Sequence, residues 1–545
     1  MLEIQNSYLN YLDNIQSKIR GEITNNKLSI LKNKIQNQEL LIPIIGGFSA
    51  GKSTLINMFL GDNILKVDIT PETALATEIR YSKENYIEAI STTHTQRFEI
   101  GDIDKIKQNA KNYKFMRVYL NNENLKKIEP LVLVDMPGFD SPIDLHNEAI
   151  LNYLDKGVHF IVLISVENGT IPKSVLRQLG DIYEFEKDFS FFLSKANLKP
   201  DSEVEEIKEE IEAQIEDELD ISKEVIPIGN SSAEELQKVL HSINPDNLIK
   251  KLFLDELKNL YSEIESSLNT KITALKTSKE ENEEAIKQLQ NSIKSLEEKK
   301  NELIQEAKQR YSTQNIDSIL SAVEREIVNS VDSLANLALK NPDYFEKELV
   351  EMIRSILIVE IKTRMGEISQ KVVQDFAIDI KSNIDIKIND DMFSMITKNI
   401  LSMPQINKVI TTMLGGILTF IPKILNPIIG VVLAVLPHIL SSFFEGQKEK
   451  KQLEEIKKQI LIKVIPSIKM NIRKNIVDIF TKQIDELIKN IANQFEEKLK
   501  SKKREIEEIE KEKQQKLNDI VEEVKKYENI KTEIKQLTNE VLYKG

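Results

Sequence analysis

The stretch "IIGGFSAGKSTLIN", residues 44–57, decides the fold of this chain. Gly46 is followed by four residues and then by Gly51, Lys52 and Ser53, which is the spacing of a phosphate-binding P-loop. The apolar run before the loop is typical of a buried strand, and a helical pattern follows it, as the motif requires. Glycines allow the backbone N–H groups to turn toward phosphate oxygens, and the N-terminus of the next helix adds positive potential. The stretch therefore predicts a nucleotide-binding site.

Each residue type in this loop has an expected chemical task. Lys52 is expected to reach the β- and γ-phosphates, and the Ser53 hydroxyl to ligate Mg²⁺. The other loop residues are expected to contact the nucleotide mainly through their backbone. The predicted nucleotide-binding residues of the loop are Gly46, Gly47, Ala50, Gly51, Lys52, Ser53 and Thr54.

A second motif, "LVLVDMPGFD" at residues 131–140, ends an apolar strand with Asp135. A carboxylate at the C-terminal edge of a strand beside the P-loop is where a second protein contact to Mg²⁺ would come from. The N–H group of Gly138, two residues after Met136, is free to sense a γ-phosphate. The motif predicts a metal-binding role for Asp135 and a nucleotide-binding role for Gly138.

Between the two motifs lies the polar loop "DITPETALATEIRY", residues 68–81, which re-enters a strand at its end. A threonine hydroxyl in such a loop can complete Mg²⁺ coordination and hold the attacking water. Either Thr70 or Thr73 fits this task, and their spacing does not choose between them.

The segment "FFLSKANL", residues 191–198, stands where a base-reading motif is expected. Lys195 can pack its alkyl stem along a nucleobase. Guanine offers a ring N–H and an amine, which call for a carboxylate, whereas this chain has Asn197, with one acceptor and one donor. Either the base preference is relaxed, or another residue reads the guanine, for example in "IGNSSAEE" at residues 228–235.

The N-terminal part of the chain alternates short apolar runs with segments long enough for helices. Such runs are typical of strands buried on both faces, so we expect an α/β fold, a mostly parallel sheet with helices on both sides. The predicted strands are 40–45, 85–90, 114–120, 131–135, 159–165, 189–194 and 224–229.

The rest of the chain predicts long helices, since no glycine occurs from residue 230 to residue 365. Apolar residues recur at steps of three and four over 272–310, 517–541 and, more weakly, 4–23, which favours coiled-coil seams. An unbroken helix over about 255–312 would be about 85 Å long. We interpret it as a stalk, although a solvated helical bundle with no special role explains the charged faces equally well.

The stretch of residues 409–444 is apolar, and from 411 to 444 it carries one formal charge, at Lys423. Its first arm, 409–422, would be about 21 Å long as a helix, too short for a hydrocarbon core of about 30 Å. The second arm is interrupted by prolines. We expect a kinked helical hairpin that enters one leaflet of a bilayer; a two-crossing anchor and a hairpin buried in a helical core stay open as alternatives.

Composition excludes several classes of protein. The formal net charge is −13, and the basic residues are scattered, which argues against a nucleic-acid partner. The chain has no cysteine and five isolated histidines, so disulfides and thiolate zinc sites are excluded. The N-terminus lacks the pattern of a signal peptide, so we expect a cytoplasmic protein that associates peripherally with membranes.

Three of these motifs, with a helical segment before the P-loop, resemble those of the dynamin superfamily, specifically bacterial dynamin-like proteins. They are "GGFSAGKSTLIN" (46–57), "TPETALATEIRY" (70–81) and "DMPGFD" (135–140). The resemblance implies a GTPase that uses GTP and Mg²⁺, assembles into homodimers or larger structures through its GTPase domains and stalk, and remodels membranes through residues 409–444. Length and composition suit the LeoA type of this family.

The resemblance also implies residue roles and an order of parts. Thr70 would be the switch threonine, and Ser49 would help neutralise transition-state charge together with a bound monovalent cation. Dynamins proper carry a glutamine where this chain has Phe48. The implied parts are a neck helix (1–40), a GTPase domain (41–245), an ascending stalk (246–400), an apolar hairpin (401–446) and a returning stalk (447–545).

Asn197 leaves a second hypothesis open, a membrane-associated scaffold that binds nucleotide but hardly hydrolyses it. A third is a helical pore-former, for which the P-loop has no explanation.

Overall fold

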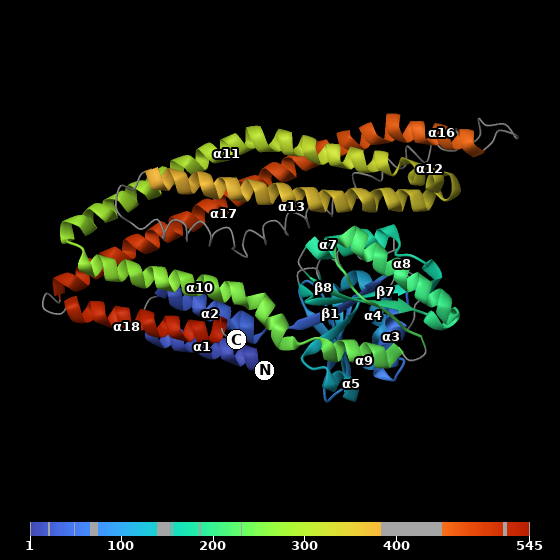
Figure 1. The fold of residues 1–545 in the computed structure, drawn as a ribbon, viewed down its shortest axis with the longest axis horizontal. Coiled ribbons are helices and arrows are strands. Elements are labelled where there is room, and N and C mark those ends of the chain that lie inside the picture. Colours follow the sequence, from blue (N-terminus) through green and yellow to red (C-terminus); the bar gives the residue numbers. More distant parts are fainter. Residues whose placement is uncertain are drawn as a thin grey trace.

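A mixed β-sheet is the framework of the N-terminal part of the molecule (Figure 1). The computed structural model describes residues 2–19, 22–47, 49–65, 75–138, 153, 156–184, 187–229, 232–382, 449–515 and 520–543. Within these ranges the sheet has nine strands in the order β4-β3-β5-β2-β6-β1-β7-β8-β9. The strands are β1 Leu40–Gly46, β2 Thr77–Tyr81, β3 Tyr86–Ile90, β4 Thr95–Phe98, β5 Phe115–Leu120, β6 Leu131–Asp135, β7 His159–Ser165, β8 Asp188–Ser194 and β9 Val225–Pro227.

The sheet confirms the predicted fold class. Strands β6, β1, β7, β8 and β9 run parallel to one another, whereas β2 is antiparallel to β6 and opens a mixed extension through β5, β3 and β4. All seven predicted strands are present, and the loop after residue 68 re-enters a strand at β2 as expected. The prediction missed β4, whose four residues are mostly exposed and therefore carry no apolar run.

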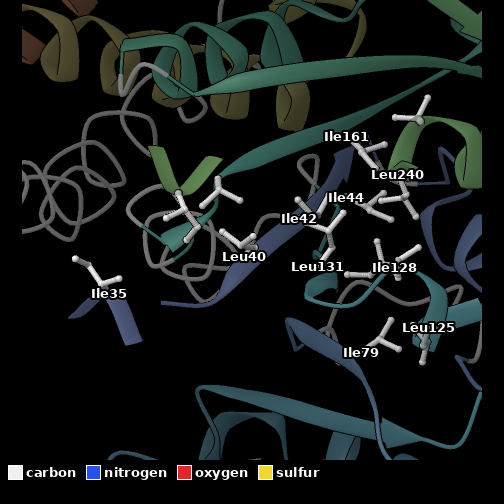
Figure 2. Packing of buried hydrophobic residues seen from close by; sticks show 14 of the residues in the cluster. Ile35, Leu40, Ile42, Ile44, Ile79, Leu125, Ile128, Leu131, Ile161 and Leu240 are labelled. Carbon is white, nitrogen blue, oxygen red and sulfur yellow. The ribbon is translucent and has the colours of Figure 1, made fainter. Parts of the chain in front are cut away.

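Helices cover both faces of the sheet. The helices of this part are α3 Lys52–Leu60, α4 Ile103–Gln108, α5 Glu123–Lys127, α7 Lys173–Glu184, α8 Asp201–Leu219 and α9 Ser232–Ser242. Alternate residues of β1 point to opposite faces, so Ile42 and Ile44 pack with Ile161 and Leu240 in one cluster (Figure 2), whereas Leu41 packs with α7 and α8 in another. The central strand is therefore buried on both sides, and its C-terminal end is held rigidly.

The remaining helices form two bundles (Figure 1). The first joins α1 Glu3–Lys18 and α2 Glu22–Gln36 to α10 Pro245–Lys276 and α18 Ile520–Thr538. The second contains α11 Lys279–Asn329, α12 Val331–Lys340, α13 Pro342–Ser382, α16 Glu449–Gln459 and α17 Ile465–Gln515. Two π-helical turns, η6 Ile460–Val464 and η7 Asn539–Tyr543, adjoin α17 and α18. The second bundle returns alongside the sheet domain, where α13 packs against α7.

The structure corrects the prediction of one unbroken helix over about 255–312. The chain breaks between α10 and α11, where the Ser278 hydroxyl accepts a hydrogen bond from the N–H of Glu281 and the Glu281 carboxylate accepts one from Ser278. Leu275 and Leu289 are buried on either side of the break. The apolar spacing thus continues through a capping box, which is why periodicity alone did not reveal it.

The N-terminal segment also differs from the expected single neck helix. It forms two helices, α1 and α2, which pack against each other before β1 begins. The hydroxyl groups of Tyr11 in α1 and Thr538 in α18 lie 2.9 Å apart, which links both ends of the chain in the first bundle. The boundaries proposed for the parts of the chain stay predictions.

The apolar stretch of residues 409–444 lies outside the described residues. Among the helices that are described, none is both long enough and apolar enough to cross a bilayer. The hairpin over residues 409–444 therefore stays a prediction from the sequence.

Candidate functional site

The P-loop connects the end of β1 to the start of α3, as its sequence spacing predicts. Gly46 has a φ of +151°, and a Cβ atom there would lie 2.3 Å from the backbone oxygen of Leu163 in β7. Gly51 has a φ of +91° and is the N-cap of α3. Ser49 between them also has a positive φ of 62° and is exposed. The loop therefore curls as a phosphate-binding loop must, and only glycine fits at Gly46.

Lys52 is the first residue of α3, and its side chain is buried in the curl of the loop. Its Nζ donates hydrogen bonds to the backbone oxygens of Gly46 and Gly47, at 3.0 Å each. The ammonium group is thus held at the N-terminal end of a helix, where positive potential already favours an anion.

The predicted metal-binding pair, Ser53 and Asp135, is brought together by the structure. The Ser53 Oγ donates a hydrogen bond of 2.7 Å to Asp135 Oδ2. Asp135 Oδ1 is buried, and no hydrogen bond reaches it from the described residues. Burial raises the pKa of Asp135, against the opposing effects of the Ser53 hydrogen bond and the charge of Lys52. A hydroxyl and a carboxylate with a free oxygen are the donors that Mg²⁺ prefers, so the residues fit that ion.

The other predicted residues at the phosphate end have different outcomes. Gly138 follows β6 in the described chain and is partly buried, as is Thr54 in α3. Thr70, Thr73 and Phe48 lie outside the described residues, so their roles stay predictions.

The base-reading segment lies at the C-terminal end of β8, two strands from β1 in the sheet. Ser194 Oγ donates to the backbone oxygen of Ala50 at 2.7 Å and to that of Ile164 at 3.2 Å. This side chain ties β8 to the P-loop and to β7. Sequence reasoning missed Ser194, although its place directly before Lys195 was a usable signal.

Lys195 adopts a left-handed conformation, with a φ of 59°, and its Nζ forms an ion pair with Glu167, just after β7. The hydrogen bond from Lys195 lowers the pKa of Glu167. Asn197 is exposed in the turn that follows. The N–H of Ala196 donates to the oxygen of Ile228 at 2.9 Å, so the residues that follow β9 lie beside the turn that contains Asn197. Glu167 was not predicted, because it meets Lys195 only through the pairing of β7 with β8, which the sequence does not reveal.

A family model described as "Dynamin family" matches residues 42–197. The chain carries a dynamin-family GTPase domain. The matched span contains the P-loop, Asp135 and the base-reading segment, which confirms the resemblance seen in the motifs.

Longer likenesses extend beyond the GTPase domain. Dynamin-like protein 1 of Campylobacter jejuni is 24% identical over 361 residues, which cover 58% of this chain and 47% of that protein. A solved structure of an oligomerised bacterial dynamin pair is 17% identical to this chain, and the match covers 99% of this chain and 82% of that chain, with a TM-score of 0.41. The LeoA bacterial dynamin GTPase from ETEC is 13% identical and covers 98% and 96%, with a TM-score of 0.32. The chain spans about half or less of the length of the curated relatives it matches.

The GTPase domain also buries a network of charged groups that sequence reasoning missed. Glu78 in β2 is 2% exposed; its Oε1 accepts from the Tyr153 hydroxyl at 2.9 Å, and its Oε2 accepts from Arg117 Nε at 2.9 Å. Arg80 Nε donates to the same Oε2 at 3.2 Å, and Arg80 Nη1 donates to Glu39 at 2.6 Å. The hydrogen bond from Arg80 lowers the pKa of Glu39 although burial acts in the opposite direction. The network thus runs from the middle of β2 to the start of β1.

Proposed function

We propose that this protein binds GTP with Mg²⁺ and hydrolyses the β–γ phosphoanhydride bond. The observation that best supports this is the buried Oδ1 of Asp135, which no described residue satisfies and which adjoins the Ser53 hydroxyl. A buried carboxylate oxygen without a partner is costly unless a ligand supplies one. Its place beside a P-loop supports the metal ion of a nucleotide as the missing partner.

The residues of the loop divide the work of phosphate binding. Lys52, now bonded to two loop carbonyls, would turn its ammonium group to the β- and γ-phosphates, and Ser53 with Asp135 would hold Mg²⁺. Mg²⁺ supplies neutralisation of the phosphate charge when it is bound. Thr70 would orient the attacking water, and Ser49 would stabilise charge in the transition state, with a monovalent cation as its proposed companion.

The test is Mg²⁺-dependent hydrolysis of GTP by the chain and by Lys52→Ala. Loss of the ammonium group should lower nucleotide affinity and turnover by at least about 100-fold, because a charge-assisted contact to phosphate is removed. Lys105→Ala is the matched control, since Lys105 is exposed and, among the described residues, forms its ion pair with Asp102, three positions away. Equal hydrolysis by Lys52→Ala and the control would refute the proposal.

We further propose that hydrolysis is coupled to self-assembly and to membrane remodelling in the cytoplasm. Two features support this. The apolar stretch 409–444 offers a lipid-binding segment in sequence, and the second bundle touches the GTPase domain where α13 packs against α7. A shift of the domain on hydrolysis would therefore reach the helices directly, and homodimers would form through GTPase domains and stalk.

Co-sedimentation with vesicles, followed by electron microscopy of the pellet, tests the coupling. Val432→Asp places a charge in the apolar stretch and should abolish nucleotide-dependent pelleting, since a charge in hydrocarbon is unfavourable. Ile462→Asp is the control, because Ile462 is an exposed residue of the second bundle. Undiminished pelleting of Val432→Asp would contradict a lipid role for this stretch.

Asn197 favours one alternative function, a membrane-associated scaffold that binds nucleotide with little hydrolysis. An assay with and without vesicles separates the two, since substantial vesicle-stimulated turnover would eliminate the scaffold. The pore-former hypothesis predicts dye release from vesicles that Lys52→Ala does not affect.

A further inference from the structure

We infer that the base site of this GTPase domain is built for a 6-oxopurine that carries an acceptor at position 2, and that it binds xanthosine triphosphate at least as tightly as GTP. The inference rests on the proposed nucleotide-binding function and assigns Asn197 as the residue that determines base specificity. Three observations on the described residues and one argument from donor and acceptor matching support it.

The first observation is that the Asn197 amide is available. Asn197 is exposed in the turn Ala196–Leu198, and within the described part of the chain no hydrogen bond occupies its side chain. The turn is held from both sides, because Ala196 N–H donates to Ile228 and Ser194 Oγ donates to the P-loop oxygen of Ala50. The turn therefore holds the Asn197 amide in a fixed position, at the same end of the sheet as the phosphate site.

The second observation is that the neighbouring loop lies tightly against this amide and brings no carboxylate of its own at the contact. A Cβ atom on Gly229 would lie 3.2 Å from Asn197 Cβ and 3.3 Å from Asn197 Oδ1. The next described side chain, Ser232, donates its hydroxyl back to the oxygen of Gly229. Among the described residues, the contact between the two segments is thus made by Gly229, which has no side chain that could bind the base in place of Asn197.

The third observation concerns the nearby carboxylates that could replace the missing aspartate. Glu167 is paired with Lys195, and Glu235 of α9 is paired with Lys238 at 2.7 Å, whereas Glu234 is an exposed residue of α9 that belongs to neither pair. Glu167 therefore holds Lys195, the lysine expected to pack along the base, and its carboxylate is bonded to the ammonium group of that lysine. Within the turn Ala196–Leu198 itself, Asn197 carries the polar side chain, and its amide has open hydrogen-bonding capacity among the described residues.

The fourth step is donor and acceptor matching. Asparagine offers one acceptor, Oδ1, and donors on Nδ2. Guanine presents two donors on this edge, N1–H and the 2-amino group, so Nδ2 would face a donor. Xanthine presents N1–H to Oδ1 and the 2-oxo group to Nδ2, so both bonds form. Hypoxanthine has no substituent at position 2 and makes one bond without a conflict.

One unmade or opposed hydrogen bond in a desolvated site corresponds to roughly a tenfold to 100-fold difference in affinity. The expected order of affinities for the Mg²⁺ complexes is therefore XTP, then ITP, then GTP, with ATP weaker because adenine offers no N1–H to Oδ1. Asn197→Asp should reverse the first part of this order, since a carboxylate accepts from both donors of guanine and repels a 2-oxo group.

The experiment is calorimetric titration of the full chain with XTP, ITP, GTP and ATP in the presence of Mg²⁺, repeated on Asn197→Asp. We expect Asn197→Asp to raise the ratio of GTP affinity to XTP affinity by roughly tenfold to 100-fold. Asn121→Asp, an equally charged change at an exposed position after β5, should leave the ratio unchanged. If Asn197→Asp does not fold, the order of the four nucleotides on the native chain decides alone.

Gly229→Ala adds a second variant, because the new Cβ atom would crowd Asn197 and weaken every base to a similar extent. Tighter binding of GTP than of XTP by the native chain would overturn the inference, as would a ratio of the two affinities that Asn197→Asp leaves unchanged. The outcomes also separate this inference from the proposed function. Tight XTP binding without hydrolysis contradicts only the GTPase proposal, Lys52-dependent hydrolysis with strict GTP preference contradicts only the inference, and no binding of any nucleotide contradicts both.

Discussion

Two carboxyl groups in the same sheet, those of Glu78 and Asp135, differ in how their buried oxygens are hydrogen-bonded. Glu78 of β2 pairs in register with Val134, the neighbour of Asp135 in β6, so the two groups belong to adjoining positions. Both oxygens of Glu78 accept hydrogen bonds, whereas Asp135 Oδ1 accepts none from the described residues. Removing Glu78 would leave two guanidinium groups without their buried partner, whereas the open oxygen of Asp135 adjoins the P-loop, where we propose that a ligand completes it.

The largest effect is expected at the satisfied group. Glu78→Ala should lower the free energy of unfolding by about 3–5 kcal/mol, because it leaves the guanidinium groups of Arg80 and Arg117 without their buried partner. Urea denaturation measures the change. Glu84→Ala is the control, since its ion pair with Arg97 is largely exposed and should contribute less than about 1 kcal/mol. Similar losses in both variants would show that the network is not a structural element.

The unsatisfied group should behave differently. Asp135→Asn should leave the free energy of unfolding of the nucleotide-free chain equal or slightly higher, because the raised pKa of Asp135 means that its ionised form is disfavoured in the folded state. A group whose pKa is raised in the folded state makes the protein less stable as the pH rises through that folded-state pKa. The Asp135→Asn variant should lack this decrease in the free energy of unfolding.

The ligand-bound state gives the matching measurement for Asp135→Asn. In the native chain a nucleotide with Mg²⁺ at 100 times its Kd adds about 2.7 kcal/mol of stability. The variant should lose the Mg²⁺-dependent part of that gain, which thermal unfolding with and without the metal records. An undiminished Mg²⁺ effect would contradict the assignment of Asp135 as a ligand.

A third treatment of a buried titratable group is found at His159, at the start of β7. Its Nε2 lies 2.9 Å from Ser190 Oγ. Burial lowers the pKa of His159 to about 4; the charge of Asp188 acts to raise this pKa, and the charge of Lys223 acts to lower it further. The unfolded chain then binds more protons than the folded chain between about pH 6.5 and 4. Stability should fall as the pH drops through that window, by about 2 kcal/mol at pH 5.

His159→Gln isolates this contribution, because an amide can still bond Ser190 but does not titrate. Urea denaturation at pH 7.5 and pH 5 should show a decrease for the native chain that exceeds that of the variant by about 2 kcal/mol. Identical decreases would mean that His159 is protonated in the folded state at pH 5.

The contrast between Asp135 and Glu78 also explains what the sequence could predict. The P-loop, Asp135 and Asn197 are recognisable because each task falls within one short motif at a strand end. Glu78 and Arg117 meet only through the register of β2 with β5, and no local pattern encodes a register.

The helical part shows the same limit in another form. Tyr8 and Leu12 lie on the predicted face of α1 and are buried, because a 3.6-residue period is a local property. The break at Ser278 escaped prediction because serine and threonine occur both inside helices and at their ends. Its effect is global, since it turns α11 away from the direction of α10.

The smallest effect is expected at this break, where a cation again satisfies backbone oxygens. Lys513 Nζ donates to the oxygens of Ala274, at 3.0 Å, and Thr277, at the C-terminal end of α10. Lys513→Met should cost about 1 kcal/mol of unfolding free energy, since the Thr277 oxygen has no further turn to bond, whereas the Ala274 oxygen also accepts from Asn282 Nδ2 at 2.9 Å. Lys511→Met, on the exposed face of α17, is the control. Lys52 bonds P-loop carbonyls in the same manner, but the phosphates of GTP should compete for its ammonium group and release it. GTP should therefore leave the stability cost of Lys513→Met unchanged. A cost that depends on nucleotide would instead mean that the break between α10 and α11 is coupled to the phosphate site.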